Sequence, residues 1–475
     1  MSFFFYDLET SGFNPRSARI VQFAGQRTDM ELRPIDNPVN LFIKLTPDIL
    51  PDPEAVLVTG ITPQMTLADG VTEAEFLTTF YDTVVADDTI FLGFNSIRFD
   101  DEFMRFINYR NFYDAYKWQW QNGCSRWDLL DVVRMTRALR PEGINWPFDS
   151  TGHPANRLGL LAEVNKLNHT NAHDALSDVN ATIALAQLVR RKQPKLFDFL
   201  LSLRDKQKVA ELVMGDQPFV YSSGTYPSEF EKTTVAAFVV QPSERQTAIV
   251  FDLRFNPDEF ANLSVAELAR RWQVKASDDA PSLPIKLLQF NRCPAVAPLG
   301  VLDGPCRKRL QLDEAVINDH FGKLKGLKGF AEKLIEALEL RDKQRQTEWT
   351  SDDQSVDGQL YDGFFDSHDS NLLPVIRVAK PDELGDFIAQ IHDPRLQALL
   401  PLYKARNYPA NLTAEEREAW ETFCQTRLLS GQTSSRLAKY MQHIQELAST
   451  TNDQTQRYIL EELRLYGESI IPVEL

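Results

Sequence analysis

Residues 3–12 of the chain read FFFYDLETSG, and this stretch decides how the fold begins. An apolar run that ends in the turn-forming residues Thr-Ser-Gly is typical of a buried β-strand. Side chains alternate between the two faces of a strand, so Asp7 and Glu9 project from the same face. Two such carboxylates repel each other and are costly to bury unless a hard divalent cation neutralises them. An exposed edge strand could also carry these acids facing water. The preceding aromatic run argues against exposure, but the stretch alone leaves both interpretations open.

The bulk composition is that of a large globular protein. A chain of 475 residues is too long for one ordinary core, and we expect two or three domains. Hydrophobic residues make up 43% and charged residues 25%, and we find neither a membrane-spanning stretch nor a signal peptide. The cysteines are scattered, which argues against structural zinc or a disulfide framework and favours the reducing cytoplasm. They are Cys124, Cys293, Cys306 and Cys424.

The net charge of −16 bears on which partners the chain can bind. Net charge governs solubility and long-range repulsion, and it does not describe a single groove. The acidic balance therefore argues against nonspecific binding to duplex DNA. It leaves open a locally basic channel for a nucleic acid.

The pattern along the chain divides it into an α/β domain, a β-rich domain and a helical domain. We place the first at residues 1–193, the second at 194–345 and the third at 360–475, with a polar linker at 346–359. The expected strands are 89–94, 233–241, 247–253 and 285–290. The expected helices are 101–113, 174–191, 331–340, 414–429, 435–447 and 454–466.

Two further segments carry residues that could join the acidic pair. Asp100 lies where the expected strand 89–94 meets a helix start, so it could cap that helix or supply a third metal ligand. The segment alone favours the cap. His173 precedes the helix at 174–191, and Asp178 lies in its first turns. Taken alone, this second segment favours a capping Asp174, a solvated Asp178 and a surface histidine.

Together the four acids and the histidine favour a catalytic interpretation. Two-metal hydrolysis requires several carboxylates that converge on two ions, and a base for the attacking water. The acids can supply the ligands, and His173 can supply the base, since the ordinary pKa of a histidine side chain suits that role. A site made only of oxygen ligands favours Mg²⁺ or Mn²⁺.

The arrangement resembles the DEDD exonuclease superfamily, in its His-containing DEDDh subclass. Three motifs occur in order: D-x-E-T-[TS]-G at residues 7–12, F-D at 99–100 and H-x4-D at 173–178. The resemblance extends over nearly the whole chain to the bacterial exonuclease I family. It is carried by residues 93–102, 125–131, 138–147, 360–365 and 403–407.

This resemblance implies an α/β RNase H-like exonuclease domain, an SH3-like β-barrel domain with added helices, and a C-terminal α-helical domain. It implies a 3′→5′ exonuclease that hydrolyses single-stranded DNA to 5′-mononucleotides in DNA repair and recombination, with two Mg²⁺ ions or Mn²⁺ in their place. The metal ligands would be Asp7, Glu9, Asp100 and Asp178, His173 would be the base, and Glu9 would also contact the substrate. An RNA-directed or proofreading exonuclease and a catalytically silent single-strand-binding protein are the alternatives.

Aromatic and basic residues interleave between residues 105 and 134, as they do in single-strand grooves. We expect Phe112, Tyr113 and Trp127 to belong to the core instead. By resemblance, the residues that bind the strand are Arg105, Tyr116, Trp120, Arg134 and Arg157.

A second basic stretch spans residues 304–345, where ten Lys and Arg face seven Asp and Glu. It could be a solvated helix face or a path for DNA, and the sequence leaves both open. The family resemblance also implies a protein partner, the acidic C-terminal tail of single-stranded DNA-binding protein. Arg140 matches a residue of the basic patch that binds this tail, and the expected state is a monomer.

Overall fold

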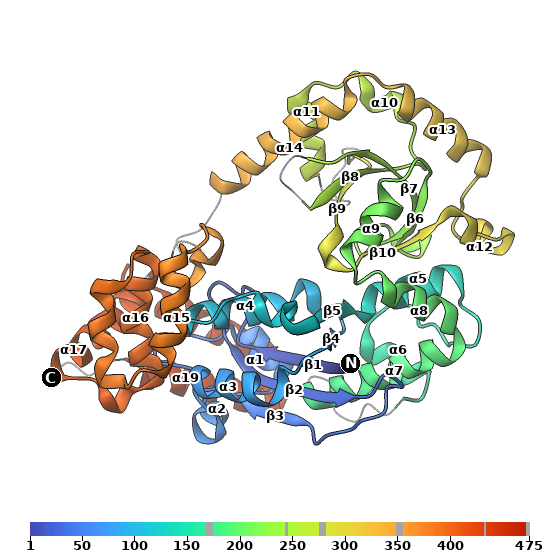
Figure 1. The fold of residues 1–475 in the computed structure, drawn as a ribbon. Helices are drawn as coiled ribbons and strands as arrows, with labels where there is room; N and C mark the ends of the chain where they lie inside the picture. The colour runs from blue at the N-terminus through green and yellow to red at the C-terminus, as the bar shows by residue number, and fades with distance from the viewer. Residues whose placement is uncertain (168–173, 243–245, 275–281, 348–354, 432–433, 472–475) are drawn as a thin grey trace.

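The computed structural model describes the whole chain except residues 168–173, 243–245, 275–281, 348–354, 432–433 and 472–475. Figure 1 shows two sheets with helices around them, and a cluster of helices that carries the C-terminal part of the chain. The long helix α14 (Phe330–Thr347) points from the second sheet toward that cluster. None of the described helices is both long and apolar enough to cross a lipid bilayer.

The first sheet places the acidic strand at its centre. Its order is β3-β2-β1-β4-β5, in which β1 runs antiparallel to β2 and parallel to β4. The strands are β1 (Ser2–Thr10), β2 (Ile20–Thr28), β3 (Val39–Phe42), β4 (Thr89–Gly93) and β5 (Ser125–Asp128). The predicted strand at 89–94 is therefore confirmed as β4. This strand order and the mixed directions define the RNase H-like architecture that the resemblance implied.

Helices cover both faces of this sheet, which explains the aromatic run in β1. Phe3 and Phe5 join the core that includes α5 (Leu129–Leu139) and α7 (Ala175–Lys192). Phe4 and Tyr6 point the other way, into the cluster with α3 (Glu73–Thr79) and α4 (Asp100–Arg110). The other helices of this part are α1 (Pro53–Thr59), α2 (Pro63–Asp69), α6 (Leu158–Val164) and α8 (Pro194–Ser202). By alternation, Asp7 and Glu9 share the face that α7 covers.

The second sheet is antiparallel throughout, in the order β10-β6-β7-β8-β9. Its strands are β6 (Phe219–Ser222), β7 (Thr233–Val240), β8 (Thr247–Asp252), β9 (Ile285–Gln289) and β10 (Ala295–Pro298). Its helices are α9 (Lys206–Val213), α10 (Asp258–Ala261), α11 (Val265–Gln273), α12 (Gly304–Arg309), α13 (Glu314–Gly326) and α14. The three strands predicted here are confirmed as β7, β8 and β9, and the predicted helix 331–340 lies within α14.

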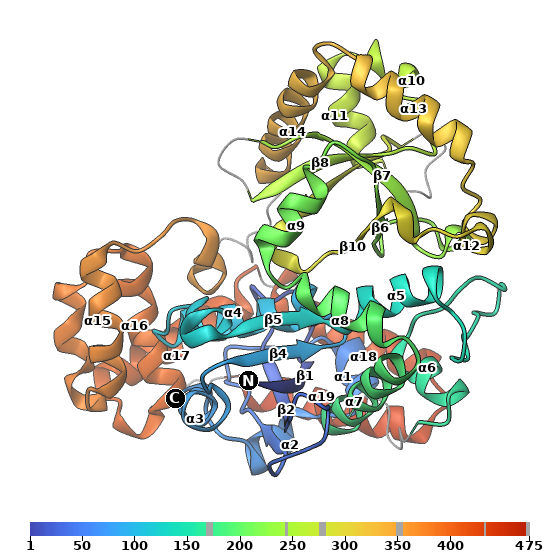
Figure 2. The ribbon, with the colours of Figure 1, turned by 45° about the vertical axis from the view of Figure 1, so that its right-hand side comes forward.

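The C-terminal part is helical, as predicted. Its helices are α15 (Ser367–Val378), α16 (Pro394–Asn407), α17 (Ala414–Leu429), α18 (Arg436–Thr450) and α19 (Gln454–Ser469). In Figure 2, α18 and α19 lie beside the first sheet and α1, and Val56 of α1 shares a core with Leu437 and Leu463. Of the predicted linker, residues 348–354 lie outside the described chain. Its last residues begin a 3-10 helix, Val356–Tyr361, in which Asp357 is fully buried.

Candidate active site

Strand β1 and helix α7 bring three carboxylates together. Oxygen atoms of Asp7, Glu9 and Asp178 all lie within 4.8 Å of one another. Glu9 is only 8% exposed, and Asp7 and Asp178 are partly buried, so this is not a fully solvated acidic surface. The expectation that Asp7 and Glu9 share a face is therefore confirmed. The alternative that Asp178 is a solvated residue is wrong, because α7 packs against β1 and turns Asp178 toward the pair.

Asp100 contacts the same strand, β1, from the start of helix α4. It is the first residue of α4, and its Oδ1 accepts a hydrogen bond from the backbone N–H of Leu8 at 3.1 Å. Phe99 occupies the cap position and makes no side-chain cap bond. The interpretation of Asp100 as an ordinary helix cap is therefore wrong. The parallel pairing of β1 with β4 explains why, since it brings the chain after β4 beside Asp7 and Leu8.

The electrostatics of these acids show that burial and mutual repulsion oppose their charged forms. Burial raises the pKa of Asp7 well above its ordinary value, and the charges of Asp100 and Asp178 raise it further. Burial, with Asp7 and Asp178, raises the pKa of Glu9 to about 9. Burial also raises the pKa of Asp100, although the Leu8 N–H opposes this. An all-oxygen, anionic and buried donor set fits hard divalent cations, which would remove this repulsion.

The predicted base, His173, belongs to residues 168–173, which lie outside the described part of the chain. Its neighbour Asp174 caps α7, because its Oδ2 accepts the N–H of Ser177 at 3.1 Å. Asp174 Oδ1 also accepts a hydrogen bond from Gln22 of β2 at 3.2 Å. The capping role expected of Asp174 is confirmed, and the cap fixes where α7 begins.

A groove of about 490 Å³ opens where α4 and the segment after it meet β9. Arg105, Tyr116 and Trp120 line it, with the Arg105 guanidinium 5.5 Å from the centre of the Tyr116 ring. Trp120 is 61% exposed, which is unusual for so large an aromatic side chain. Arg105 lies five residues along α4 from Asp100, about 7.5 Å of helix rise. The groove and Asp100 therefore share helix α4.

The groove contains cations that the sequence analysis did not single out. They are Arg126, which was only noted among the interleaved residues, and Arg204, Lys206 and Arg292. Arg126 donates to Asp101 and to the Asn291 carbonyl, so it joins the first sheet to the second. Arg292 lies 3.4 Å from Glu102, the carboxylate that also holds Arg105 at 2.6 Å. These residues reach Trp120 only because the two sheets pack together, and no local sequence pattern predicts that contact.

Two of the predicted strand-binding residues lie elsewhere. Arg134 pairs with Asp131 at 2.6 Å, and its guanidinium lies so close to Gly224 that a Cβ there would meet it at 2.8 Å. Arg157 is exposed at the start of α6. Neither lines the groove of Arg105 and Trp120. Their roles stay predictions.

All three aromatic residues assigned to the core pack in or against it, although Tyr113 is only partly buried and also meets the C-terminal helices. Phe112 and Trp127 are fully buried. Tyr113 is only half-buried, stacked on Tyr81 at 4.5 Å between ring centres, with Arg377 over its ring at 3.9 Å. Arg377 comes from α15, so Tyr113 belongs to the contact with the C-terminal helices.

The basic residues near the second sheet are partly engaged in local contacts. Lys323 pairs with Asp319 at 2.7 Å, as on a solvated helix face. Arg341 pairs with Asp342 at 2.8 Å, but its side chain is largely buried over the Trp272 ring of α11. Arg140 follows α5, donates to the Val301 carbonyl at 3.0 Å and lies 3.8 Å from Asp303. Its side chain is 37% exposed, so part of it is available to a partner.

An RNase H-like sheet with carboxylates converging from β1, α4 and α7 defines a divalent-metal-dependent nuclease of the DEDD type. Family models match the chain in three parts: "Exonuclease" over residues 4–186, "Exonuclease I SH3-like domain" over 204–339 and "Exonuclease I C-terminal domain" over 354–470. The chain belongs to the exonuclease I family, and it is a hydrolytic 3′→5′ exonuclease of single-stranded DNA. The SH3-like assignment of the second domain is thereby confirmed.

Individual relatives match from end to end. Exodeoxyribonuclease I of Haemophilus influenzae is 36% identical over 478 residues, covering 99% of both chains. A crystal structure of Escherichia coli exonuclease I with a dA16 oligonucleotide superposes with a TM-score of 0.92 at 36% identity, over 99% of both chains. A structure described as an ExoI/SSB-Ct complex superposes with a TM-score of 0.90 at 35% identity, again over 99% of both chains.

Proposed function

We propose that this exonuclease removes 3′-terminal nucleotides by two-metal-ion hydrolysis, with Asp7, Glu9, Asp100 and Asp178 as the metal ligands. The observation that supports it is the cluster of carboxylate oxygens within 4.8 Å, in which burial and mutual repulsion raise the pKa values of Asp7 and Glu9. The donor set fits Mg²⁺, with Mn²⁺ as the alternative ion. Bound there, two such ions would lower the pKa of the attacking water and offset charge on the leaving 3′ oxygen.

The side chains of the chain itself have separate parts in the reaction. Asp7 and Asp178 face each other across β1 and α7, so their spacing is set by sheet-to-helix packing. Asp100 is oriented by the Leu8 N–H and therefore moves with β1. Glu9, next to the β1 end, would also contact the 3′ terminus of the strand. His173 would take the proton of the attacking water, and the product would be a 5′-mononucleotide.

The groove of Arg105, Tyr116 and Trp120 is our proposed path for the DNA that leads to the site. Single-strand grooves combine cations that follow the phosphates with aromatic rings on which bases stack. Arg204, Lys206 and Arg292 give this groove the first property, and exposed Trp120 gives it the second. Arg134 and Arg157 remain proposed contacts outside it.

We further propose that the acidic C-terminal tail of single-stranded DNA-binding protein binds near Arg140. The half-exposed guanidinium of Arg140 and the similar ExoI/SSB-Ct complex support this. A cytoplasmic role in DNA repair and recombination is consistent with four cysteines that are buried and free. The proposed domain limits are 1–193, 194–345 and 360–475, joined by 346–359.

The test of the mechanism is kinetic. Asp178→Ala and His173→Ala should each lower the rate on 5′-labelled single-stranded DNA by orders of magnitude, roughly 10²- to 10⁴-fold for the base. Asp174→Asn is the matched control, because asparagine also caps helices. Asp174 follows His173 directly and lies four residues before Asp178. Circular dichroism should show the fold intact. Normal rates in either alanine variant would refute the assignment.

The alternatives are separated by substrate. Single-stranded DNA, duplex DNA and RNA of one sequence would be compared with and without Mg²⁺. Preference for RNA would favour the RNA-directed alternative, and binding without hydrolysis would favour a silent single-strand-binding protein. Our proposal requires Mg²⁺-dependent hydrolysis that is faster on single-stranded DNA than on duplex DNA or RNA.

A further inference from the structure

We propose that Asp357 is a positioning residue for the reaction, and that it acts through Arg19 on the loop that follows the catalytic strand. Asp357 lies at the end of the linker at 346–359, inside the stretch 354–470 that the C-terminal domain model matches, so we count it here with that domain. Through this contact the C-terminal domain would set the geometry at Glu9, in addition to any part it has in holding DNA. The inference rests on a chain of contacts that can be followed residue by residue.

The first step is the loop between β1 and β2. Ser11 donates its N–H to the Arg19 carbonyl at 2.8 Å, and Arg19 donates its N–H to Ser11 Oγ at 2.8 Å. These two bonds close the loop just beyond the metal ligand Glu9. The β1–β2 register shifts between Glu9 and Thr10, so the regular ladder is interrupted at this point. The backbone position of Glu9 therefore depends on how the loop is held at Ser11 and Arg19.

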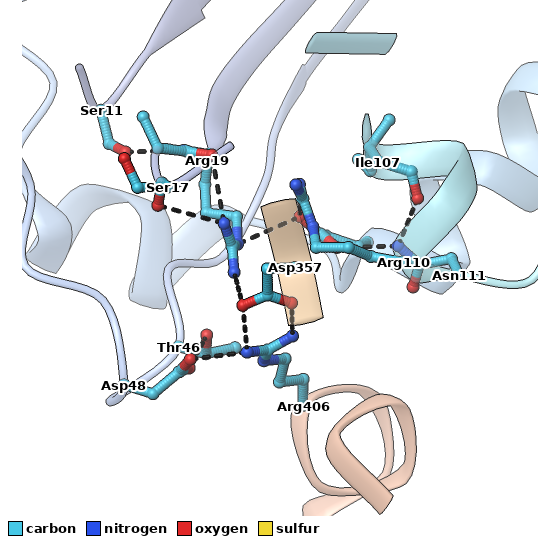
Figure 3. A network of polar contacts seen from close by, with 12 residues as sticks. Ser11, Ser17, Arg19, Thr46, Asp48, Ile107, Arg110, Asn111, Asp357 and Arg406 are labelled. Carbon is cyan, nitrogen blue, oxygen red and sulfur yellow. Dashed lines mark hydrogen bonds and ion pairs between the residues drawn. The ribbon is translucent and has the colours of Figure 1, made fainter. Parts of the chain in front are cut away.

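The second step is the Arg19 side chain, which is 3% exposed. Its guanidinium donates back to the loop, to the carbonyls of Ser17 and Ala18 at 3.1 and 3.2 Å. Its remaining terminal nitrogen donates to Asp357 Oδ2 at 2.9 Å (Figure 3). Arg16 of the same loop adds a second hydrogen bond, to the Gly358 carbonyl at 2.6 Å. The loop is thus tied to one short segment of the C-terminal domain.

The third step is that Asp357 is itself fixed. It is fully buried, and Arg406 of α16 donates to its two oxygens at 2.7 and 2.8 Å. Arg427 of α17 lies 3.4 Å away. Although burial alone would raise it, these cations hold the pKa of Asp357 well below its ordinary value. A charged, immobile carboxylate is a firm anchor for Arg19.

The same network supplies a matched comparison, because Asp48 joins the domains through Arg406 and, among the described residues, shares no hydrogen bond with Arg19. Asp48 is equally buried and accepts a hydrogen bond from Arg406 at 2.8 Å (Figure 3). Asp48 forms ion pairs with Arg406 at 2.8 Å and with Arg427 at 3.9 Å. If the network served only to hold the domains together, removing the charge of Asp48 or of Asp357 would change kcat equally. If Asp357 positions the loop, only the loss at Asp357 should lower kcat.

The experiment compares Asp357→Asn with Asp48→Asn in the full chain. We expect Asp357→Asn to lower kcat on a single-stranded oligonucleotide roughly 10- to 100-fold with little change in KM, since small displacements of a catalytic group cost that much. We expect both substitutions to lower the melting temperature, because each removes a buried charge from the network. Asp48→Asn should nevertheless keep kcat near that of the unaltered protein. Hydrogen exchange of the peptide that contains Ser11 gives a readout independent of activity, and it should speed up only in Asp357→Asn.

Arg19→Lys decides the matter if Asp357→Asn does not fold. Lysine keeps the charge beside Asp357 but loses the donors to Ser17 and Ala18, so kcat should fall and exchange at Ser11 should rise. The double variant with Asp357→Asn should lose no more than the larger single loss, because both act on one contact. Equal kcat losses in the two asparagine variants, or an unchanged kcat in both Asp357→Asn and Arg19→Lys, would overturn the proposal.

Discussion

At the scale of single residues, the repulsion among Asp7, Glu9 and Asp178 predicts a link between pH, metal and stability. The pKa of Glu9 is raised from 4.5 to about 9 in the folded protein. Between these values the folded state binds a proton that the unfolded chain has released, so the free energy of unfolding falls as the pH rises. With EDTA, the melting temperature should therefore be lower at about pH 8.5 than at about pH 6. Mg²⁺ should raise it more at the higher pH, because the ligands must be deprotonated.

The control for this prediction is Glu9→Gln, which removes the titrating group and keeps its size. Its melting temperature with EDTA should depend less on pH than that of the unaltered protein, and Mg²⁺ should raise it less. Thermal unfolding followed by circular dichroism at the two pH values measures both. The same Mg²⁺-induced shift at each pH would contradict the proposed metal site.

The residues of the site differed in how far the sequence could place them. Asp7 and Glu9 were predictable because strand alternation is a local rule, and the face they share follows from spacing alone. Asp100 was not, because the carboxylate after β4 reaches β1 only through parallel pairing between distant segments. Asp178 was likewise ambiguous from its own helix. For these two residues it was the combination of all five side chains, and the family motif that they match, that indicated the site.

At the scale of elements, the groove between α4 and β9 predicts how the strand is held. Trp120→Ala should weaken binding of single-stranded DNA by about 1–3 kcal/mol, the cost of one stacked base. The affinity would be measured by fluorescence anisotropy on an Asp178→Ala background, so that the strand is not degraded. Lys117→Gln, also exposed and three residues away, is the control. Equal affinities for the Trp120 and Lys117 variants would place the strand elsewhere.

The groove cations predict a change in salt dependence. Lys206→Gln should reduce the slope of log affinity against log salt by about 0.7, the value for one phosphate contact on a single strand. Lys208→Gln is the matched control, because Lys208 is exposed on the same helix α9 but does not line the groove. A slope unchanged in both variants would show that Lys206 does not contact a phosphate.

The elements also show where sequence patterns end. Helix α17 begins and ends at the predicted residues, because Thr413 and Glu416 form a capping box at its start. The environment of the linker expected at 346–359 was harder to predict, because its polar composition indicates a solvated loop. Asp357 is instead buried by Arg19, Arg406 and Arg427, whose contribution comes from segments far apart in the chain. Composition describes the average environment of a residue type and cannot reveal such partners.

At the scale of the whole molecule, a net charge of −16 repels both DNA and an acidic peptide at long range. Binding of the acidic tail must therefore depend on a few local cations, and it should weaken steeply with salt. Arg140→Gln should raise the Kd of a fluorescent peptide with the tail sequence by about tenfold, as expected for losing one charge-assisted hydrogen bond. Lys325→Gln changes the net charge equally but lies on α13, so it separates the local effect from the global one. Equal effects of the two substitutions would mean that the tail responds to overall charge and not to a site at Arg140.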